Sequence, residues 1–213
     1  MASFGFAPYL LLFVSGGLAL VYELLWMRRF AVVFGATTPA VSATLAAVFL
    51  GFAVGSAVLG ARASRFANPL RAYGLLEIGA GLSALLVEPM LKLYDLIYPA
   101  FYGALSGSVA GFLAVKTLLA VLALFAPTFF MGGTVPVLSQ AFERDREWRR
   151  LGISAGGLYA ANTFGAVAGA LSVPFFWLPK LGAPASYGAS VAGSILVGTA
   201  ACWLSRGAPA PRP

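Results

Sequence analysis

The sequence predicts an all-α integral membrane protein with about six transmembrane helices and both termini in the cytoplasm. Of its 213 residues, 60% are hydrophobic and only 10% are charged, and the mean hydropathy is +0.88. A soluble domain with a wetted surface does not have this composition. Successive apolar stretches also approach the ~20 residues that a helix needs to cross a ~30 Å hydrocarbon core. We expect one helical domain over residues 1–206 and a flexible, proline-rich tail over residues 207–213.

The expected spans follow one another along the whole chain. They are residues 8–34, 39–59, 70–90, 108–130, 153–178 and 184–204. A short turn at residues 35–38 separates the first two spans. The third is expected to end near Glu88 and Pro89, because proline disrupts the helical hydrogen-bond ladder and glutamate prefers water. Residues 94–107 are then expected to form a loop or an interfacial stretch.

The fourth span contains residues that disturb a straight helix before the charged run that begins at Glu143. These residues are Pro127, Gly132, Gly133 and Pro136. One reading is a kink or break that makes residues 126–136 a cavity wall, since proline and glycine at membrane depth are tolerated where a cavity or neighbouring helices satisfy the backbone. The other reading is a long tilted helix with a simple proline kink.

The arginines and lysines set the expected orientation. Nine of the 14 fall on one side of the membrane: Arg62, Arg65, Arg71, Arg144, Arg146, Arg149, Arg150, Arg206 and Arg212. The positive-inside rule places this side in the cytoplasm, in a multi-pass protein of the cell (inner or plasma) membrane. The net charge of +7 is therefore mainly a topology signal, and no nucleic-acid partner is expected, because the basic residues sit in short loops beside spans.

The residue types of the chain argue against most catalytic chemistry. Cys202 is the only cysteine and there is no histidine, so no intrachain disulfide, zinc, haem or iron–sulfur site and no cofactor is expected. The sequence also has no glycine-rich nucleotide fingerprint and no evident nucleophile–base pair. We expect no catalytic residues and no metal site, and an enzyme is the last of the functional readings.

Small residues recur at the spacing of helix interfaces. Gly51 pairs with Gly55, Ser56 with Gly60, and Gly165 with Gly169. Such spacing lets helix backbones approach closely in lipid, where dispersion supplies much of the attraction. These glycines are predicted to serve helix packing rather than ligand binding.

Three ionisable residues lie inside apolar runs, namely Glu23, Glu77 and Lys116. Each costs about 2.5–3.5 kcal/mol at a helix centre, so we expect each to be paired, to face a polar cavity or to be functional. With 1.5 Å of rise per residue, Glu23 and Lys116 reach similar depths and are expected to meet, either as a structural ion pair or as part of a ligand site. Glu77 lies nearer the cytoplasm without an obvious partner, and we expect it to contact a proton or a cationic substrate.

Three ordered motifs carry a family resemblance. They are SGGLAL at 15–20 leading to YE at 22–23 and WMR at 26–28, MGGTVP at 131–136, and GLYAANTFGA at 157–166. Together they resemble the membrane region of fused major-facilitator/spermidine-synthase-like proteins, which are polyamine aminopropyltransferase-like. The resemblance implies a bundle of half-major-facilitator type, and it adds Tyr159 and Asn162 to Glu23 and Lys116 as residues that line a cavity. The soluble synthase domain common in that family is not present in this sequence.

Three functional readings follow. The leading one is a non-catalytic membrane module that acts through a partner, either another copy of itself or a larger membrane complex, with a cavity for a cation or polyamine. An alternative is a homodimeric transporter of a polyamine or another organic cation, since six spans are half of a twelve-helix transporter. Another is the membrane half of a split system whose synthase-like protein is separate and soluble.

Overall fold

The structure is a computed structural model that describes residues 6–105, 107–144 and 154–206. Within these ranges the secondary structure is helical and contains no strand. Five stretches are long and apolar enough to cross a membrane: Ala7–Phe34, Thr38–Arg65, Pro69–Ala100, Val109–Gln140 and Ala155–Leu204. The prediction of an all-helical chain is therefore confirmed for the described residues, which contain five stretches suited to cross a membrane by length and composition. The expectation of six spans stays a prediction. The expected tail at residues 207–213 lies outside the described residues.

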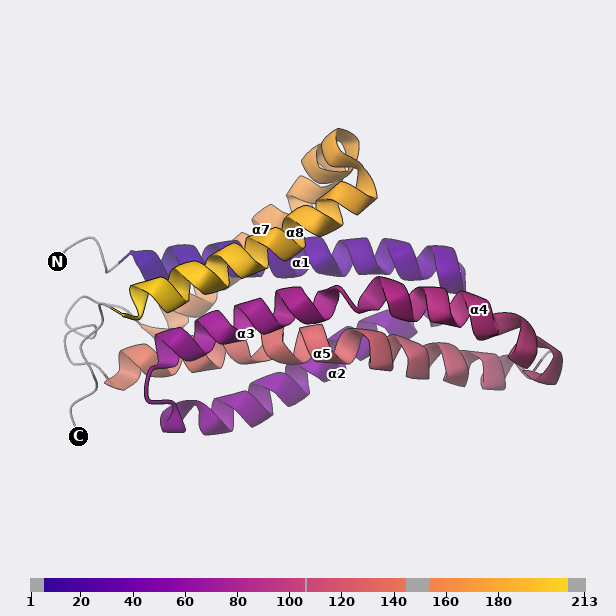
Figure 1. The fold of residues 1–213 in the computed structure, drawn as a ribbon, viewed down its shortest axis with the longest axis horizontal. Coiled ribbons are helices and arrows are strands. Elements are labelled where there is room, and N and C mark those ends of the chain that lie inside the picture. Colours follow the sequence, from indigo (N-terminus) through magenta and orange to yellow (C-terminus); the bar gives the residue numbers. More distant parts are fainter. Residues whose placement is uncertain (1–5, 106, 145–153, 207–213) are drawn as a thin grey trace.

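Figure 1 shows the order of the helices along the described residues. In chain order they are α1 (Ala7–Phe34), α2 (Thr38–Arg62), a 3₁₀ turn (Ala63–Arg65), α3 (Pro69–Ala84), α4 (Val87–Leu105), α5 (Val109–Arg144), α7 (Ala155–Ser172), a π-helical turn (Val173–Trp177) and α8 (Leu178–Leu204). Two of these helices begin with a side-chain cap. The Asn68 side chain caps α3 by accepting from the Arg71 amide at 3.0 Å, and Ser154 caps α7 in the same way.

The structure differs from the expectation that residues 94–107 form a loop or interfacial stretch. After a turn at Leu85 and Leu86, α4 continues as a helix through Leu105. Two contacts explain why the helix does not end at Glu88. The Glu88 carboxylate is bound by an arginine of α1, and Tyr94 is buried with its ring 5.1 Å from that of Phe34.

The fourth expected span is one continuous helix rather than a broken one. Helix α5 contains 36 residues and passes through Pro127 and Pro136 without a break. Its glycines lie against α2, where Gly132 meets the backbone of Phe52 and Gly133 meets Leu59. Close packing against α2 accounts for these residues without a cavity wall.

The last apolar stretch, Ala155–Leu204, is 50 residues long and contains a reversal of the chain. Gly182 has a positive φ of 73°, a conformation that glycine adopts without steric cost, and it interrupts the helical geometry inside α8. In Figure 1, α7 crosses α1 and the chain then returns along α8 toward the end at which α7 starts. The first described residues of α1 and the last of α8 therefore lie at the same end of the molecule.

The main helix contacts form three pairs, α1 with α7, α2 with α5 and α3 with α8, and α3 also lies against α5. The first two pairs are built alike. Gly165 of α7 lies against the backbone of Phe13 in α1, and Gly51 of α2 lies against Thr128 and Phe129 in α5. The remaining interface glycines follow the same scheme: Gly16, Gly17 and Gly169 lie between α1 and α7, and Gly55, Gly60, Gly132 and Gly133 lie between α2 and α5.

Candidate functional site

The deepest polar centre is built around Glu77 on α3. The residue is only 3% exposed, and the Ser15 hydroxyl of α1 donates a hydrogen bond to its carboxylate. Tyr73 lies one turn before Glu77, is fully buried, and donates to the Leu11 carbonyl of α1 at 3.1 Å. The sequence had suggested no partner for Glu77, and the structure supplies one from α1.

Two further buried hydroxyls belong to this region. Tyr22 of α1 lies near both Glu77 and Ser194 of α8. The hydroxyls of Tyr22 and Ser194 are buried close to one another, and neither forms a well-aligned hydrogen bond with the described residues. A carboxyl group and two hydroxyls therefore lie together between α1, α3 and α8. Such groups are able to hold a proton or to contribute oxygen ligands to a small cation.

An aromatic cluster lies beside this centre. The Trp26 indole donates to the Tyr187 hydroxyl at 3.1 Å, and Tyr187 donates in turn to the Ala84 carbonyl of α3 at 2.6 Å. The Tyr22 ring stacks on Trp26 with centroids 5.2 Å apart and meets Tyr187 edge-on at 5.8 Å. These contacts tie α1, α3 and α8 together and fix the positions of the buried hydroxyls.

Lys116 and Glu23 are not brought together. The Lys116 ammonium donates to the carbonyl of Phe34, the last residue of α1, at 2.8 Å. Phe34 lies 11 residues beyond Glu23, which corresponds to about 16 Å along the helix. Lys116 therefore neutralises the negative end of the α1 dipole, which is a favourable position for a cation.

Glu23 itself is only partly buried. It makes no ion pair or hydrogen bond within the part of the chain that the structure describes. It lies 16 residues from Ala7 and 11 from Phe34, so it is about 24 Å and 16 Å from the two ends of α1. Glu23 is thus an ionisable group at membrane depth that a single copy leaves partly open.

Tyr159 and Asn162 also lie apart from a common cavity. Tyr159 is 64% exposed on α7, whereas Asn162 is partly buried where Gly16 of α1 approaches its backbone. Two surface hollows of about 390 and 440 Å³ are present, and none of the four residues predicted to line a cavity borders either of them. One copy of the chain does not assemble that predicted site from its described residues.

Arg29 of α1 and Glu88 in the first turn of α4 form a two-pronged ion pair. The guanidinium donates two hydrogen bonds of 2.9 and 2.7 Å to the carboxylate. Both side chains are partly exposed, at 37% and 41%. The pair joins α1 to α4 and was not anticipated from the sequence.

Sequence reasoning also missed the hydroxyl groups around Glu77. Ser15 was visible only as part of the first motif, and Ser194 carried no signal at all. The sequence does place a hydroxyl-bearing residue in each of three apolar helices, but it does not show which of these residues face one another.

No cluster of residues suited to a metal ion occurs among the described residues. Comparisons with protein-family models, curated proteins and solved structures found no match to this chain.

Proposed function

We propose that this chain is a membrane module that works through a partner in the bilayer, either a second copy of itself or a subunit of a larger complex. The observation that carries the proposal is Glu23, which is partly open at membrane depth and has no partner among the described residues. An ionisable side chain near the centre of a bilayer costs about 2.5–3.5 kcal/mol and almost always faces a bundle interior or a water-filled cavity. A partner that covers the Glu23 face of α1 supplies such an environment.

The helix pairing supports a half-transporter architecture for the module. Counting the stretch Ala155–Leu204 as two crossings, because the chain reverses at Gly182, gives six crossings. The first three crossings are α1, α2 and α3, and the last three are α5, α7 and α8. When α1 is exchanged with α5, α2 with α7 and α3 with α8, the α1–α7 pair becomes the α5–α2 pair and the α3–α8 pair stays the same. Inverted three-helix repeats of this kind build each half of a major-facilitator transporter.

The proposed topology follows the distribution of basic residues. The sequence assigns nine of the 14 lysines and arginines to one side, and we propose that this side is the cytoplasm and that the membrane is the cell membrane. Glu23 then lies in the outer half of the bilayer, and Glu77 lies nearer the cytoplasm.

A second candidate function is a homodimeric transporter of an organic cation such as a polyamine. The symmetric pairing of the helices favours it, because two six-crossing copies provide the two walls of a central site. Glu23 from each copy would then supply the negative charge near the midplane. Cation uptake into proteoliposomes that persists in Glu23→Gln would exclude this version.

Site-directed cross-linking along α1 tests the leading proposal. Cys202→Ser gives a cysteine-free background in one step, since the chain has a single cysteine. Cysteine is then placed at Leu20 or Met27, one turn on either side of Glu23, and for comparison at Leu82 of α3, which is 52% exposed. Native membranes are treated with a short thiol-to-amine cross-linker.

We expect adducts from positions 20 and 27 in higher yield than from position 82. A dimer mass identifies a second copy, and a heavier adduct identifies another subunit. Glu23→Gln in the same background is expected to change the yield of cross-linked adducts, because it replaces the carboxylate that the partner covers. Equal yields from all three positions, with a monomer mass in mild detergent, would overturn the proposal.

A further inference from the structure

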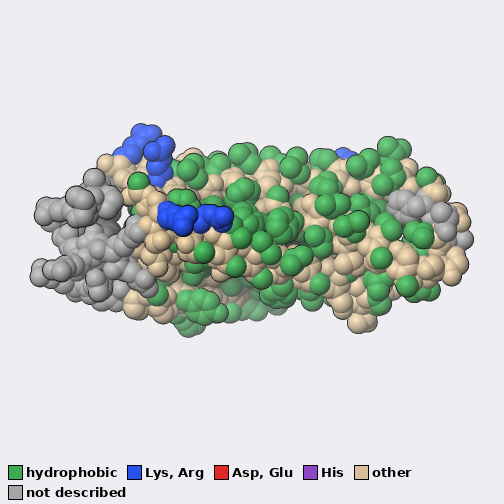
Figure 2. Space-filling view, turned by 90° about the horizontal axis from the view of Figure 1, so that it is seen from below, with side chains coloured by type: hydrophobic (Ala, Val, Ile, Leu, Met, Phe, Trp, Pro, Cys, Tyr) green, Lys and Arg blue, Asp and Glu red, His purple; other side chains and the backbone are tan. Residues whose placement is uncertain are grey.

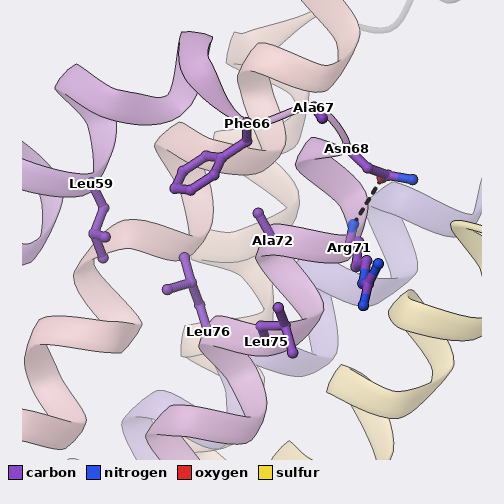
Figure 3. A pocket seen from close by; sticks show the side chains of 8 residues that line it. All are labelled: Leu59, Phe66, Ala67, Asn68, Arg71, Ala72, Leu75 and Leu76. Carbon is purple, nitrogen blue, oxygen red and sulfur yellow. Dashed lines mark hydrogen bonds between the residues drawn. The ribbon is translucent and has the colours of Figure 1, made fainter. Parts of the chain in front are cut away.

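A hollow opens at the turn between α2 and α3. It has a volume of about 390 Å³ and is lined by Leu59, Phe66, Ala67, Asn68, Arg71, Ala72, Leu75 and Leu76. Figure 3 shows the side chains of Leu59, Phe66 and Leu76 turned toward a common space, with Arg71 to one side of it. The lining is therefore apolar over most of its extent and cationic at one edge.

The depth of the hollow suits a membrane lipid. Leu59 lies three residues before Arg62, the end of α2, and Leu76 lies seven residues after Pro69, the start of α3. These separations correspond to about 5 and 10 Å along the two helices. The apolar wall thus extends from the end of the helices into the depth at which the first part of an acyl chain lies.

The arginines of this turn are not neutralised within the described residues. Arg62, Arg65 and Arg71 are exposed, and none of them forms an ion pair there. Arg62 donates only to the Val58 carbonyl of its own helix, at 3.1 Å. One of these arginines, Arg71, borders the hollow, and Arg62 and Arg65 belong to the same α2–α3 turn. None of the three has an acidic partner among the described residues.

The start of α3 adds to the positive potential. Its first turn, from Asn68 to Arg71, borders the hollow, and the amino-terminal end of a 16-residue helix carries a partial positive charge. On the face shown in Figure 2, basic side chains gather mainly toward this end of the molecule, and no acidic side chain of the described residues is visible. Charge and shape both favour an anionic amphiphile.

We propose that this hollow binds an anionic phospholipid. The phosphate contacts Arg71 and the neighbouring arginines, and an acyl chain lies against Leu59, Phe66 and Leu76. Basic pockets between transmembrane helices on the cytoplasmic side take anionic headgroups, and each nearby arginine contributes substantially to that attraction. A free phosphate ion would leave the apolar wall unused, so the lipid is the occupant that satisfies both halves of the site.

Lipid titration of the purified, delipidated protein tests this assignment. Binding of phosphatidylglycerol and of phosphatidylcholine with identical acyl chains is followed by native mass spectrometry. Arg62→Ala, Arg65→Ala and Arg71→Ala are combined in one variant. Arg28→Ala, which removes an exposed arginine at the other end of α1, serves as the matched control. Ala72→Phe fills the hollow and leaves all charges in place.

The expected result is a preference for phosphatidylglycerol that falls about fivefold for each arginine removed, or about a hundredfold in the triple variant. Arg28→Ala should bind like the parent protein. Ala72→Phe, checked for an unchanged unfolding temperature, should lose most of the tight binding. If it unfolds, Leu75→Gln at the exposed edge of the hollow replaces it and should weaken binding in the same direction.

Three outcomes would overturn the assignment. Equal affinity for phosphatidylglycerol and phosphatidylcholine would show that the hollow does not recognise an anionic headgroup. Full competition by inorganic phosphate would identify a soluble-anion site. Unchanged phosphatidylglycerol binding in the triple variant would place the lipid elsewhere. None of these results depends on whether α1 has a protein partner, so this site and the proposed function fail separately.

Discussion

Replacing Gly165 by alanine should force α1 and α7 apart. A methyl group at this position would lie 2.6 Å from the carbonyl carbon of Phe13 and 2.8 Å from its Cα atom, and the obstructing atoms are backbone. The carbonyl oxygen of Phe13 would lie closer still. Because ordinary contact begins at 3.4 Å, the two helices must separate by more than about 0.8 Å. Overpacking of this kind costs about 1–3 kcal/mol.

The matched control is Gly188→Ala in α8, where an added Cβ meets nothing within 4 Å. Both substitutions gain about 1 kcal/mol of helix propensity, so their difference isolates the overlap with α1. We expect Gly165→Ala to unfold about 2–12 °C below Gly188→Ala, since a cost of about 1–3 kcal/mol corresponds to about 2–4 °C per kcal/mol for a chain of this size.

The assay is thermal unfolding in one detergent, followed by loss of the monodisperse peak in size-exclusion chromatography. Both variants are measured in the Cys202→Ser background, so that oxidation does not contribute to the loss. Equal unfolding temperatures for the two alanine variants would refute the close approach of α1 and α7. A stabilised Gly165→Ala would refute it more strongly.

Four further substitutions test individual contacts by the same unfolding assay. Ser15→Ala should destabilise by about 1–3 kcal/mol, because the buried Glu77 loses its hydrogen-bond donor; a neutral effect would contradict the buried centre. Tyr187→Phe should cost about 1–3 kcal/mol, because it leaves a buried indole and a backbone carbonyl without partners. Lys116→Met should cost about 1–2 kcal/mol and increase hydrogen exchange at the end of α1, and unchanged exchange there would count against the contact. Arg29→Ala should cost less than about 1 kcal/mol because the ion pair is partly exposed, and the cost should shrink further at high salt.

Most of the fold could be predicted because the bilayer restricts what an apolar chain can do. Runs of about 20 predominantly apolar residues with few charges leave only a helix as a spanning structure. The expected boundary between the last two spans, at residues 178–184, contains Gly182, where the structure reverses. Residues 94–107 were misread, because their helix depends on Glu88 meeting Arg29 and on Tyr94 meeting Phe34. Long-range contacts of this kind leave no local signal.

The candidate site could be predicted only as a set of residues, not as an arrangement. Depth along a helix follows from residue number, but rotation about the helix axis does not, because every face of these helices is apolar. Glu23 and Lys116 were therefore predicted to lie at similar depth and to meet. In the structure, Lys116 instead donates a hydrogen bond to a carbonyl at the end of α1. The partner of Glu77 was missed for the same reason, since nothing in the sequence turns Ser15 toward α3.

The two intramembrane carboxylates have different physical situations, and this difference points to where function lies. Glu77 receives a hydrogen bond inside the chain and is enclosed, so its burial is compensated by α1 without any partner. Glu23 lies on the same helix as Ser15 but has no such compensation among the described residues. On the proposal that the chain works through a partner in the bilayer, this uncompensated carboxylate marks the face of α1 that the partner covers.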